Sequence, residues 1–358
     1  MEIKNYEDLK LLAKEFDVPV EDVLFIALNR YGVMYDTEDN RIRFYLKLNT
    51  LNEEFFFAVC VNTYPSPFSI VGKELFLDGE KVGDLSRIEK DTCTSTYFRK
   101  GNTAMTINSN SRSQCAGCKF CGTYKLDSDE DENLTSKQAI IDYYTQVMKD
   151  NNFKDLSDMY QITVCTGCFP SEDDLVEHLI LLKKTLKQNF NFNGKINYIG
   201  SQLRSPEKLE RIKEEIGDFS LYVTTEKFTG RERIMRPEKA SLTFDSTIKL
   251  LDTAISLGFT ASILYILGLE DLDIVIDYFT KLVPHVNKFP DVQIYQDYTP
   301  EQESYRCEDA KDFRYYLKAR KFFEEAFAPT TLKPRSWENY RSLYYTSFNH
   351  EKYVCERK

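Results

Sequence analysis

The chain contains 358 residues, which is enough for one large domain or two smaller ones. Hydrophobic residues make up 42% of the sequence and charged residues 29%, as is usual for a globular protein with a sizeable core. The formal net charge of -10 argues against a general nucleic-acid-binding protein, because binding to the phosphate backbone requires clustered Lys and Arg.

Neither a membrane span nor a secretory signal is predicted. No apolar run reaches about 18 residues, the length from which a spanning helix is inferred. Residues 1–14 carry acidic side chains and lack the continuous apolar region of a signal peptide. We therefore expect a cytoplasmic protein with no membrane partner and no nucleic-acid partner.

Residues 1–95 are expected to form a small α+β domain. Apolar residues at helical spacing follow Asn5 and continue over 20–31. Alternating residues predict a strand over 41–48, with a partner strand over 54–61. No motif in this domain indicates chemistry. A packing or oligomerisation role and a role in substrate recognition therefore remain as alternatives.

Strand-like and helix-like stretches alternate through residues 96–327. Predicted strands cover 103–107, 160–166, 195–200, 219–225, 260–267 and 292–298. Predicted helices cover 136–149, 171–187, 205–215, 244–257, 272–286 and 312–327. Such alternation indicates an α/β fold with a parallel sheet, either an incomplete barrel or an open doubly wound sheet. In both folds ligands bind at the carboxyl ends of the strands.

The tail, residues 328–358, is expected to be a C-terminal cover segment. It contains the only Trp, Trp337, and later the run Leu343-Tyr344-Tyr345. We expect it to pack across the barrel rather than extend into solvent.

Nine cysteines are present, and their spacing does not suggest a disulfide framework. Three of them, Cys115, Cys118 and Cys121, lie within seven residues of one another, after the first strand of the alternating region. Such a loop can direct three sulfurs at one metal centre, and thiolates favour zinc, copper(I) or iron–sulfur clusters. The loop is therefore the predicted metal site.

The stretch Cys118-Lys119-Phe120-Cys121 resembles the cluster loop of radical S-adenosylmethionine (SAM) enzymes. That family has the pattern Cys-x3-Cys-x2-Cys, often with an aromatic residue before the last Cys, and Phe120 occupies the aromatic position. Here two residues separate Cys115 from Cys118, where the family has three. Either the loop is shortened, or another residue, for which Cys93 is the candidate, supplies the first ligand.

The resemblance covers about residues 100–327 and implies a partial (β/α)6 TIM-like barrel. It also implies a [4Fe-4S] cluster held by Cys115, Cys118 and Cys121. Three thiolates leave one iron open to SAM, and an electron from the cluster then releases a 5'-deoxyadenosyl radical. An electron donor such as flavodoxin or ferredoxin is implied as a partner.

By the same resemblance, residues at successive strand ends are assigned to SAM. The Thr-Gly-Cys run after the second strand lies where the family receives the methionine amino group, and the glycine after the fifth strand resembles an adenine-binding turn. The assigned SAM-binding residues are Phe120, Thr166, Gly167, Cys168, Ser201, Gln202, Glu226, Arg233, Arg236, Gly268 and Leu269. Four residues at the end of the sixth strand are expected to face the substrate: Tyr295, Gln296, Asp297 and Tyr298.

Two alternatives remain open at the sequence level. A non-catalytic protein could hold a structural zinc between two Cys-x2-Cys pairs, at Cys115, Cys118, Cys165 and Cys168. Within the enzyme class we expect a small-molecule substrate, and a peptide docked on residues 1–95 is the alternative. A peptide-binding domain should expose a strand edge or a groove, whereas a small-molecule enzyme should have a closed pocket above residues 295–298.

Overall fold

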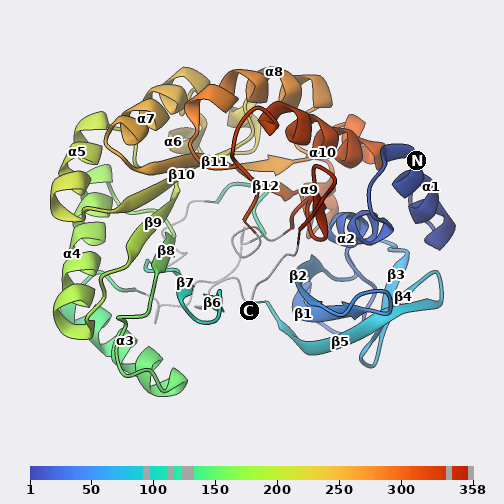
Figure 1. Ribbon diagram of the computed structural model, residues 1–358, viewed down its shortest axis with the longest axis horizontal. Coiled ribbons are helices and arrows are strands. Elements are labelled where there is room, and N and C mark those ends of the chain that lie inside the picture. The colour runs from blue at the N-terminus through green and yellow to red at the C-terminus, as the bar shows by residue number, and fades with distance from the viewer. Residues whose placement is uncertain (92–96, 111–116, 123–132, 336–340, 354–358) are drawn as a thin grey trace.

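The computed structural model describes residues 1–91, 97–110, 117–122, 133–335 and 341–353 (Figure 1). It begins with two helices, α1 (Tyr6–Phe16) and α2 (Val20–Tyr31). An antiparallel sheet follows, with the strand order β2-β1-β5-β4-β3. Its strands are β1 (Arg41–Leu48), β2 (Glu54–Cys60), β3 (Phe68–Val71), β4 (Glu74–Leu77) and β5 (Glu80–Lys90).

The two faces of this N-terminal sheet differ in character because side chains alternate along each strand. Ile42, Phe44 and Leu46 of β1 are buried in the apolar core. Arg41, Arg43 and the other odd-numbered residues of β1 therefore project from the opposite face.

The second sheet has the order β12-β11-β10-β9-β8-β7-β6, and all neighbouring pairs are parallel except β6 with β7. Its strands are β6 (Tyr97–Arg99), β7 (Ala104–Ile107), β8 (Gln161–Cys165), β9 (Lys195–Gly200), β10 (Phe219–Glu226), β11 (Thr260–Leu267) and β12 (Asp291–Ile294).

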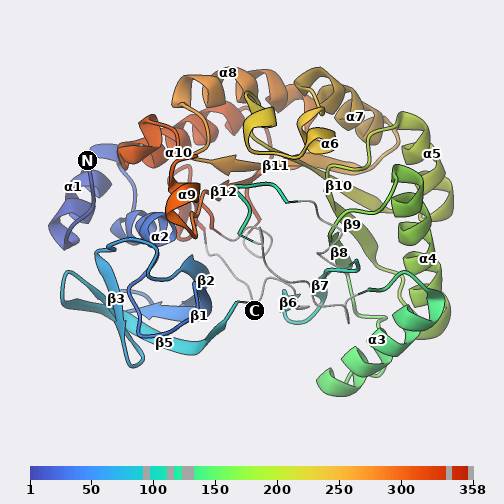
Figure 2. The same ribbon diagram turned by 180° about the vertical axis from the view of Figure 1, so that it is seen from behind.

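Helices cover the outside of this sheet, which curls into a half barrel (Figures 1 and 2). They are α3 (Lys137–Asn151), α4 (Glu172–Phe190), α5 (Pro206–Glu215), α7 (Phe244–Ser256), α8 (Leu272–Leu282) and α10 (Arg314–Phe327). The predicted α/β fold with a partial, TIM-like barrel is confirmed at this level.

Several short elements were not predicted from the sequence. They are β6, the helical turns η3 (Arg231–Arg233), α6 (Pro237–Ala240), α9 (Pro300–Glu303) and η5 (Asp309–Lys311), and the hairpin β13 (Ser347–Phe348) and β14 (Glu351–Lys352). The predicted helix over 272–286 ends in a separate helical turn, η4 (Val283–His285). The last barrel strand ends at Ile294 rather than at residue 298, because Tyr298 N donates to the Gln302 side chain and Pro300 begins α9. Residues 295–298 therefore form a loop at the barrel rim.

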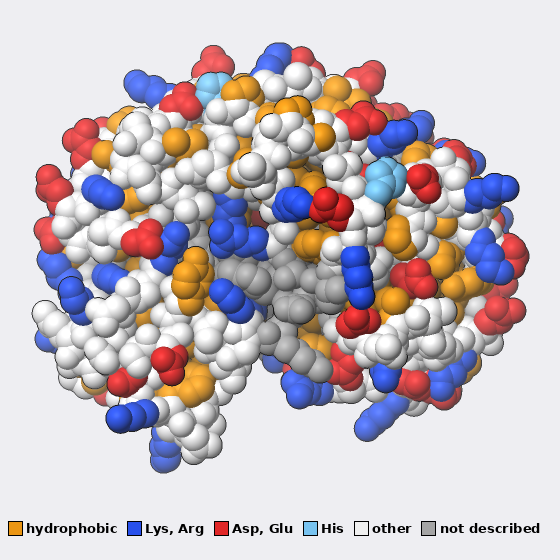
Figure 3. Space-filling model, in the orientation of Figure 1, with side chains coloured by type: hydrophobic (Ala, Val, Ile, Leu, Met, Phe, Trp, Pro, Cys, Tyr) orange, Lys and Arg blue, Asp and Glu red, His pale blue; other side chains and the backbone are white. Residues whose placement is uncertain are grey.

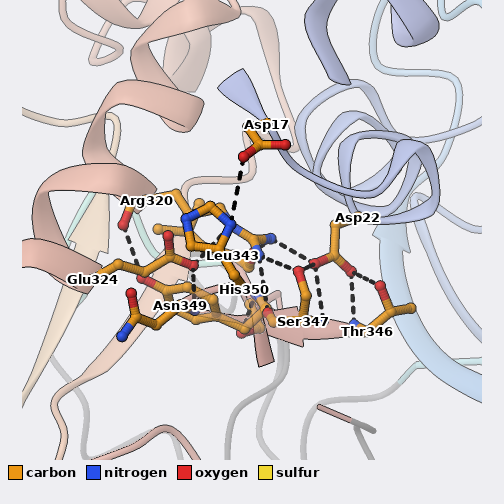
Figure 4. Close-up of polar contacts among 11 residues, drawn as sticks. Asp17, Asp22, Arg320, Glu324, Leu343, Thr346, Ser347, Asn349 and His350 are labelled. Carbon is orange, nitrogen blue, oxygen red and sulfur yellow. Dashed lines mark hydrogen bonds and ion pairs between the residues drawn. The ribbon is translucent and has the colours of Figure 1, made fainter. Parts of the chain in front are cut away.

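A buried polar network joins the N-terminal helices, the last barrel helix and the tail (Figure 4). Asp22 of α2 lies 2.6 Å from the Arg320 guanidinium of α10, and both side chains are at most 1% exposed. The backbone and side chain of Thr346 and of Ser347 donate to the Asp22 carboxylate. Arg320 also donates to the Leu343 carbonyl. The apolar core is continuous from Ile3 to Phe348.

In the part of the chain that the structure describes, every helix is too short or too polar to cross a bilayer.

Candidate functional site

A cavity of about 520 Å³ lies between the half barrel and the N-terminal sheet. One wall is formed by β7, by the carboxyl ends of β8, β9 and β10, and by residues that follow β12. The other wall is formed by β1, β2 and β5 of the N-terminal sheet. Figure 1 shows these two groups of strands on opposite sides of the molecule's centre. The N-terminal sheet thus lies across the open side of the half barrel, at the end where ligands bind in such folds.

The cysteine loop reaches this cavity through a tight turn. Gly117 has a φ of 74°, a backbone conformation that glycine adopts readily. Cys121 N then donates to the Cys118 carbonyl over 2.9 Å, which closes a β-turn with one Cys at each end. Both thiols line the cavity, and Phe120 between them is 4% exposed in an apolar cluster with Ile234.

The same loop is anchored to α9 by one side chain. Gln302 donates to the carbonyls of Lys119 and Cys121 over 2.9 and 3.0 Å, and its oxygen accepts from Tyr298 N. The Tyr298 ring packs directly on the loop, since a Cβ on Gly122 would lie 2.5 Å from it. Gln302 therefore fixes the cysteines relative to the residues that follow β12.

Gln302→Ala should lower the free energy of unfolding by about 1–3 kcal/mol, because three backbone groups lose their partner. Gln302→Glu keeps the acceptor for Tyr298 N and should be milder. Urea unfolding checks both variants, and Gln138→Ala, on the exposed face of α3, is the control. A Gln302→Ala protein as stable as this control would show that the anchor is dispensable.

Glu226 and Lys239 form an ion pair inside the cavity. The register between β10 and β11 shifts at Glu226, whose φ is 56°, and this bulge directs the carboxylate inward. Burial lowers the pKa of Lys239, but Glu226 and Cys118 outweigh burial and raise it, so the ammonium stays charged. Burial raises the pKa of the Cys118 thiol, while Lys239 acts against that increase.

The loop after β8 is held by side chains from two neighbouring strand ends. Gln202 exchanges two hydrogen bonds of 2.8 Å with the backbone of Phe169. Asn108 accepts from Gly167 N, and Asn110 donates to the Cys168 carbonyl. The amide of Gln202 thus positions this loop.

The approach to the cysteine loop is also supported by a buried histidine. His178 Nε2 lies 2.8 Å from Ser109 Oγ, and its ring packs on Phe169 with centroids 4.8 Å apart. Burial lowers the pKa of His178 from 6.5 to about 4.

Lowering the pH from 6.5 to about 4 should destabilise the protein through His178. In this range the unfolded chain binds a proton that the folded chain does not, so stability falls by about 1.4 kcal/mol per pH unit, or about 3 kcal/mol in total. His178→Gln cannot take up this proton and should lack that component. Urea unfolding at several pH values checks the difference, and identical pH profiles for the two proteins would contradict it.

Most of the predicted SAM and substrate residues meet in the cavity. Those that line it are Cys118, Phe120, Cys121, Thr166, Gly167, Cys168, Ser201, Gln202, Glu226, Arg236, Tyr295, Gln296 and Tyr298. Gln296 also donates to the Ala58 carbonyl of β2, and Tyr298 OH donates to Gln296. The residues after β12 therefore connect the two walls.

Other predicted residues lie away from the cavity, and Cys115 falls outside the described residues. The Arg233 side chain is 83% exposed beside Glu232. Asp297 is fully buried and pairs with Arg306 over 2.7 Å, which indicates a structural role. Gly268 and Leu269 do not line the cavity: Gly268 lies against Tyr295 and Arg306, and Leu269 is in the apolar cluster around Phe120.

Sequence reasoning missed the basic residues of the cavity. Lys239, from α6, and four arginines of the N-terminal sheet and β6 line it: Arg41, Arg43, Arg87 and Arg99. Alternation along β1 was the available signal, because it places Arg41 and Arg43 on one face and apolar residues on the other.

The thiols that the structure describes do not support the zinc alternative. Three of the four thiols of the proposed zinc site, Cys118, Cys165 and Cys168, are described. No group of three or more Cys, His, Asp or Glu side chains that could hold a metal is found among the described residues.

No protein-family model matches the chain, and no curated protein matches it. Among solved structures it is similar to Escherichia coli coproporphyrinogen III oxidase, a radical SAM enzyme, with 14% identity over 59% of this chain and 50% of that one, at a TM-score of 0.41. It is similar to HydG, a maturase of the [FeFe]-hydrogenase, with 16% identity over 66% of this chain and 53% of HydG, at a TM-score of 0.44. It is also similar to the Streptococcus suis protein SuiB, with 12% identity over 64% of this chain and 46% of SuiB, at a TM-score of 0.39. The chain spans about half the length of these proteins.

Proposed function

We propose that this chain is a radical SAM enzyme that acts on a small molecule. The observation that carries the proposal is the position of Cys118 and Cys121. Both lie on one β-turn and open into a cavity at the carboxyl ends of half-barrel strands, with Phe120 buried between them. This placement supports the cluster loop that the sequence motif predicts.

The residues present fit a [4Fe-4S] cluster and SAM. Cys118, Cys121 and, from the sequence, Cys115 would hold the cluster. SAM would lie against the remaining polar groups of the same wall, namely Ser201, Glu226, Arg236 and the backbone of Gly167. When bound, the two cofactors would supply radical chemistry for removing a hydrogen atom from the substrate.

The rest of the chain would enclose and orient the substrate. The N-terminal sheet limits the entry of water, which protects reactive intermediates. Tyr298 and Gln296 are held in place by their mutual hydrogen bond and would contact the substrate. A cavity of about 520 Å³ beside these residues has room for a small molecule, which favours such a substrate over a docked peptide.

The proposal has consequences for partners and location. A small redox protein such as flavodoxin or ferredoxin would deliver the electron. The thiols must stay reduced, as in the cytoplasm, before they bind iron. We assign substrate recognition to residues 1–95, catalysis to 96–327 and a covering role to 328–358.

The test uses protein purified and reconstituted without oxygen. Iron and sulfide are counted, and the protein is then incubated with dithionite and SAM. We expect about four irons per chain and formation of 5'-deoxyadenosine. A colourless protein that carries one zinc and leaves SAM intact would overturn the proposal.

A further inference from the structure

Glu226 adopts a backbone conformation that is rare for a residue with a side chain. Its φ is 56°, in the left-handed region that few residues other than glycine enter. Lys227 N donates to the Thr225 carbonyl over 2.7 Å, which closes a three-residue turn around Glu226. A turn of this kind whose central residue has a positive φ is the rare and strained form of the γ-turn. The strained residue is also the one that pairs with Lys239 in the cavity.

The side chain of Arg231 holds this turn. Its guanidinium donates to the carbonyls of Thr225 and Lys227, the two residues that flank Glu226. It also donates to the Lys239 carbonyl over 2.7 Å. Strained backbone persists only where the surrounding structure holds it, and such strain gathers at functional sites. Arg231 therefore binds the backbone on both sides of the strained residue and the backbone of its ion-pair partner.

The position of Arg231 is unusual for a charged side chain. Lys and Arg side chains are spread over the surface of the face drawn in Figure 3, as is usual in proteins. Arg231 is only 5% exposed, and burial lowers the pKa of its guanidinium while Glu226 acts against that decrease. A buried charge is costly unless hydrogen bonds satisfy it. The three carbonyls supply such bonds, so Arg231 links the end of β10 to α6.

The loop after the turn is held by a different side chain. The buried carboxylate of Glu270 accepts from Phe228 N and Thr229 N, each over 2.7 Å. Both donors follow the turn rather than flank Glu226. Loss of the Arg231 guanidinium should therefore release the turn without releasing the loop.

The cysteine turn is also held independently of the Arg231 side chain. The Ile234 carbonyl accepts from Lys119 N over 2.8 Å, and Gln302 donates to the Lys119 carbonyl. Ile234 N donates to the backbone carbonyl of Arg231 over 3.3 Å, a bond that remains when the side chain is replaced. Loss of the guanidinium should therefore disturb Glu226 and leave the cysteine turn in place.

We propose that Arg231 is a positioning residue, which holds the strained turn so that the Glu226 carboxylate, paired with Lys239, meets SAM in a fixed position. The inference rests on the proposed function, in which Glu226 lies against SAM. Arg231 is not among the described residues that line the cavity, so it acts through the residues it holds. A planar guanidinium presents several donors in a fixed geometry, which the single ammonium of lysine reproduces only in part.

The experiment measures iron content and SAM affinity on the full, anaerobically reconstituted protein. SAM is titrated calorimetrically without a reductant, so that it is not cleaved. The test variant is Arg231→Gln, and Arg231→Lys is the conservative variant. The matched control is Lys183→Gln, because Lys183 is also a buried cation that donates to a carbonyl. Its acceptor, Gly194, directly precedes β9 and thus lies at the amino end of that strand, away from the cavity.

We expect Arg231→Gln to keep the iron of the wild-type protein and to raise the SAM dissociation constant about tenfold or more, as loss of a group that orients a ligand-binding residue does. Arg231→Lys should recover part of the affinity, and Lys183→Gln should leave iron and affinity unchanged. Amide hydrogen exchange over 225–229, measured before SAM is added, should be faster in Arg231→Gln than in wild-type protein. A purely structural role would instead lower iron content and SAM affinity together.

Two results would overturn the inference: equal SAM affinity in Arg231→Gln and wild-type protein, or a parallel loss of iron and affinity in that variant. In both cases wild-type protein that binds SAM and forms 5'-deoxyadenosine leaves the proposed function in place. Wild-type protein that binds no SAM refutes the proposed function and the inference together, and this outcome is recognised without any variant.

Discussion

Replacing Asp22 with Ala should lower the free energy of unfolding by about 3–5 kcal/mol, because it leaves the buried Arg320 guanidinium without its main counter-charge. Burial alone would lower the pKa of Arg320, but Asp22, Glu324 and Tyr344 together outweigh burial and raise it, so Arg320 stays charged in the folded state. The substitution also removes the acceptor of four hydrogen bonds from Thr346 and Ser347.

Urea unfolding of Asp22→Ala and Asp22→Asn measures this effect. The control is Glu15→Ala, which breaks an ion pair between Glu15 and Arg314 of α10 that is partly exposed, at 39% and 30%. Exposed pairs of this kind contribute about 0–1 kcal/mol. An Asp22→Ala protein no less stable than the control would mean that the network is compensated elsewhere.

The network also matters for the cavity. Arg320 and Asp22 fix the tail at Leu343 to Ser347, directly after Arg341. Arg341 both extends the edge of β12 through its carbonyl and lines the cavity with its side chain. Loss of Asp22 should therefore loosen the segment that places Arg341 at the cavity as well as lower stability.

The elements that could be predicted from sequence are those with a clear apolar period and local start or stop signals. Residues 244–256 show this: Thr243 caps α7 together with Ser246, and Gly258 follows its end. Short elements without such signals, such as β6, could not be found. Contacts between distant residues, such as Asp22 with Arg320, leave no trace in any local pattern.

The cavity was partly predictable for a similar reason. Parallel strands bring their carboxyl ends together, so Cys168, Ser201 and Glu226 could be expected to meet. The opposite wall, formed by the N-terminal sheet, could not be predicted. Nothing in the local sequence indicates that the face of β1 carrying Arg43 lies across the barrel. Arg233 shows that nearness in sequence to a site residue is not enough. It lies a few residues after Glu226, but its side chain is exposed and does not enter the cavity.

Replacing Cys118 with Ala should abolish iron retention and reduce 5'-deoxyadenosine formation by about a hundredfold or more. With one of three thiolates missing, a [4Fe-4S] cluster has too few protein ligands. The apolar packing around residue 118 tolerates the smaller side chain, so the fold should remain. Iron content, visible absorption and product formation are the measurements.

The matched control is Cys307→Ser. Cys307 is also partly buried, but it lies outside the cavity, and its thiol donates to the Glu270 carbonyl, a bond that serine can retain. This variant should keep its iron and its activity. If Cys118→Ala and Cys307→Ser bound equal iron, the β-turn would not be the metal site. The cluster would then have to be held by other cysteines, and the cavity would lose its assigned source of radical chemistry.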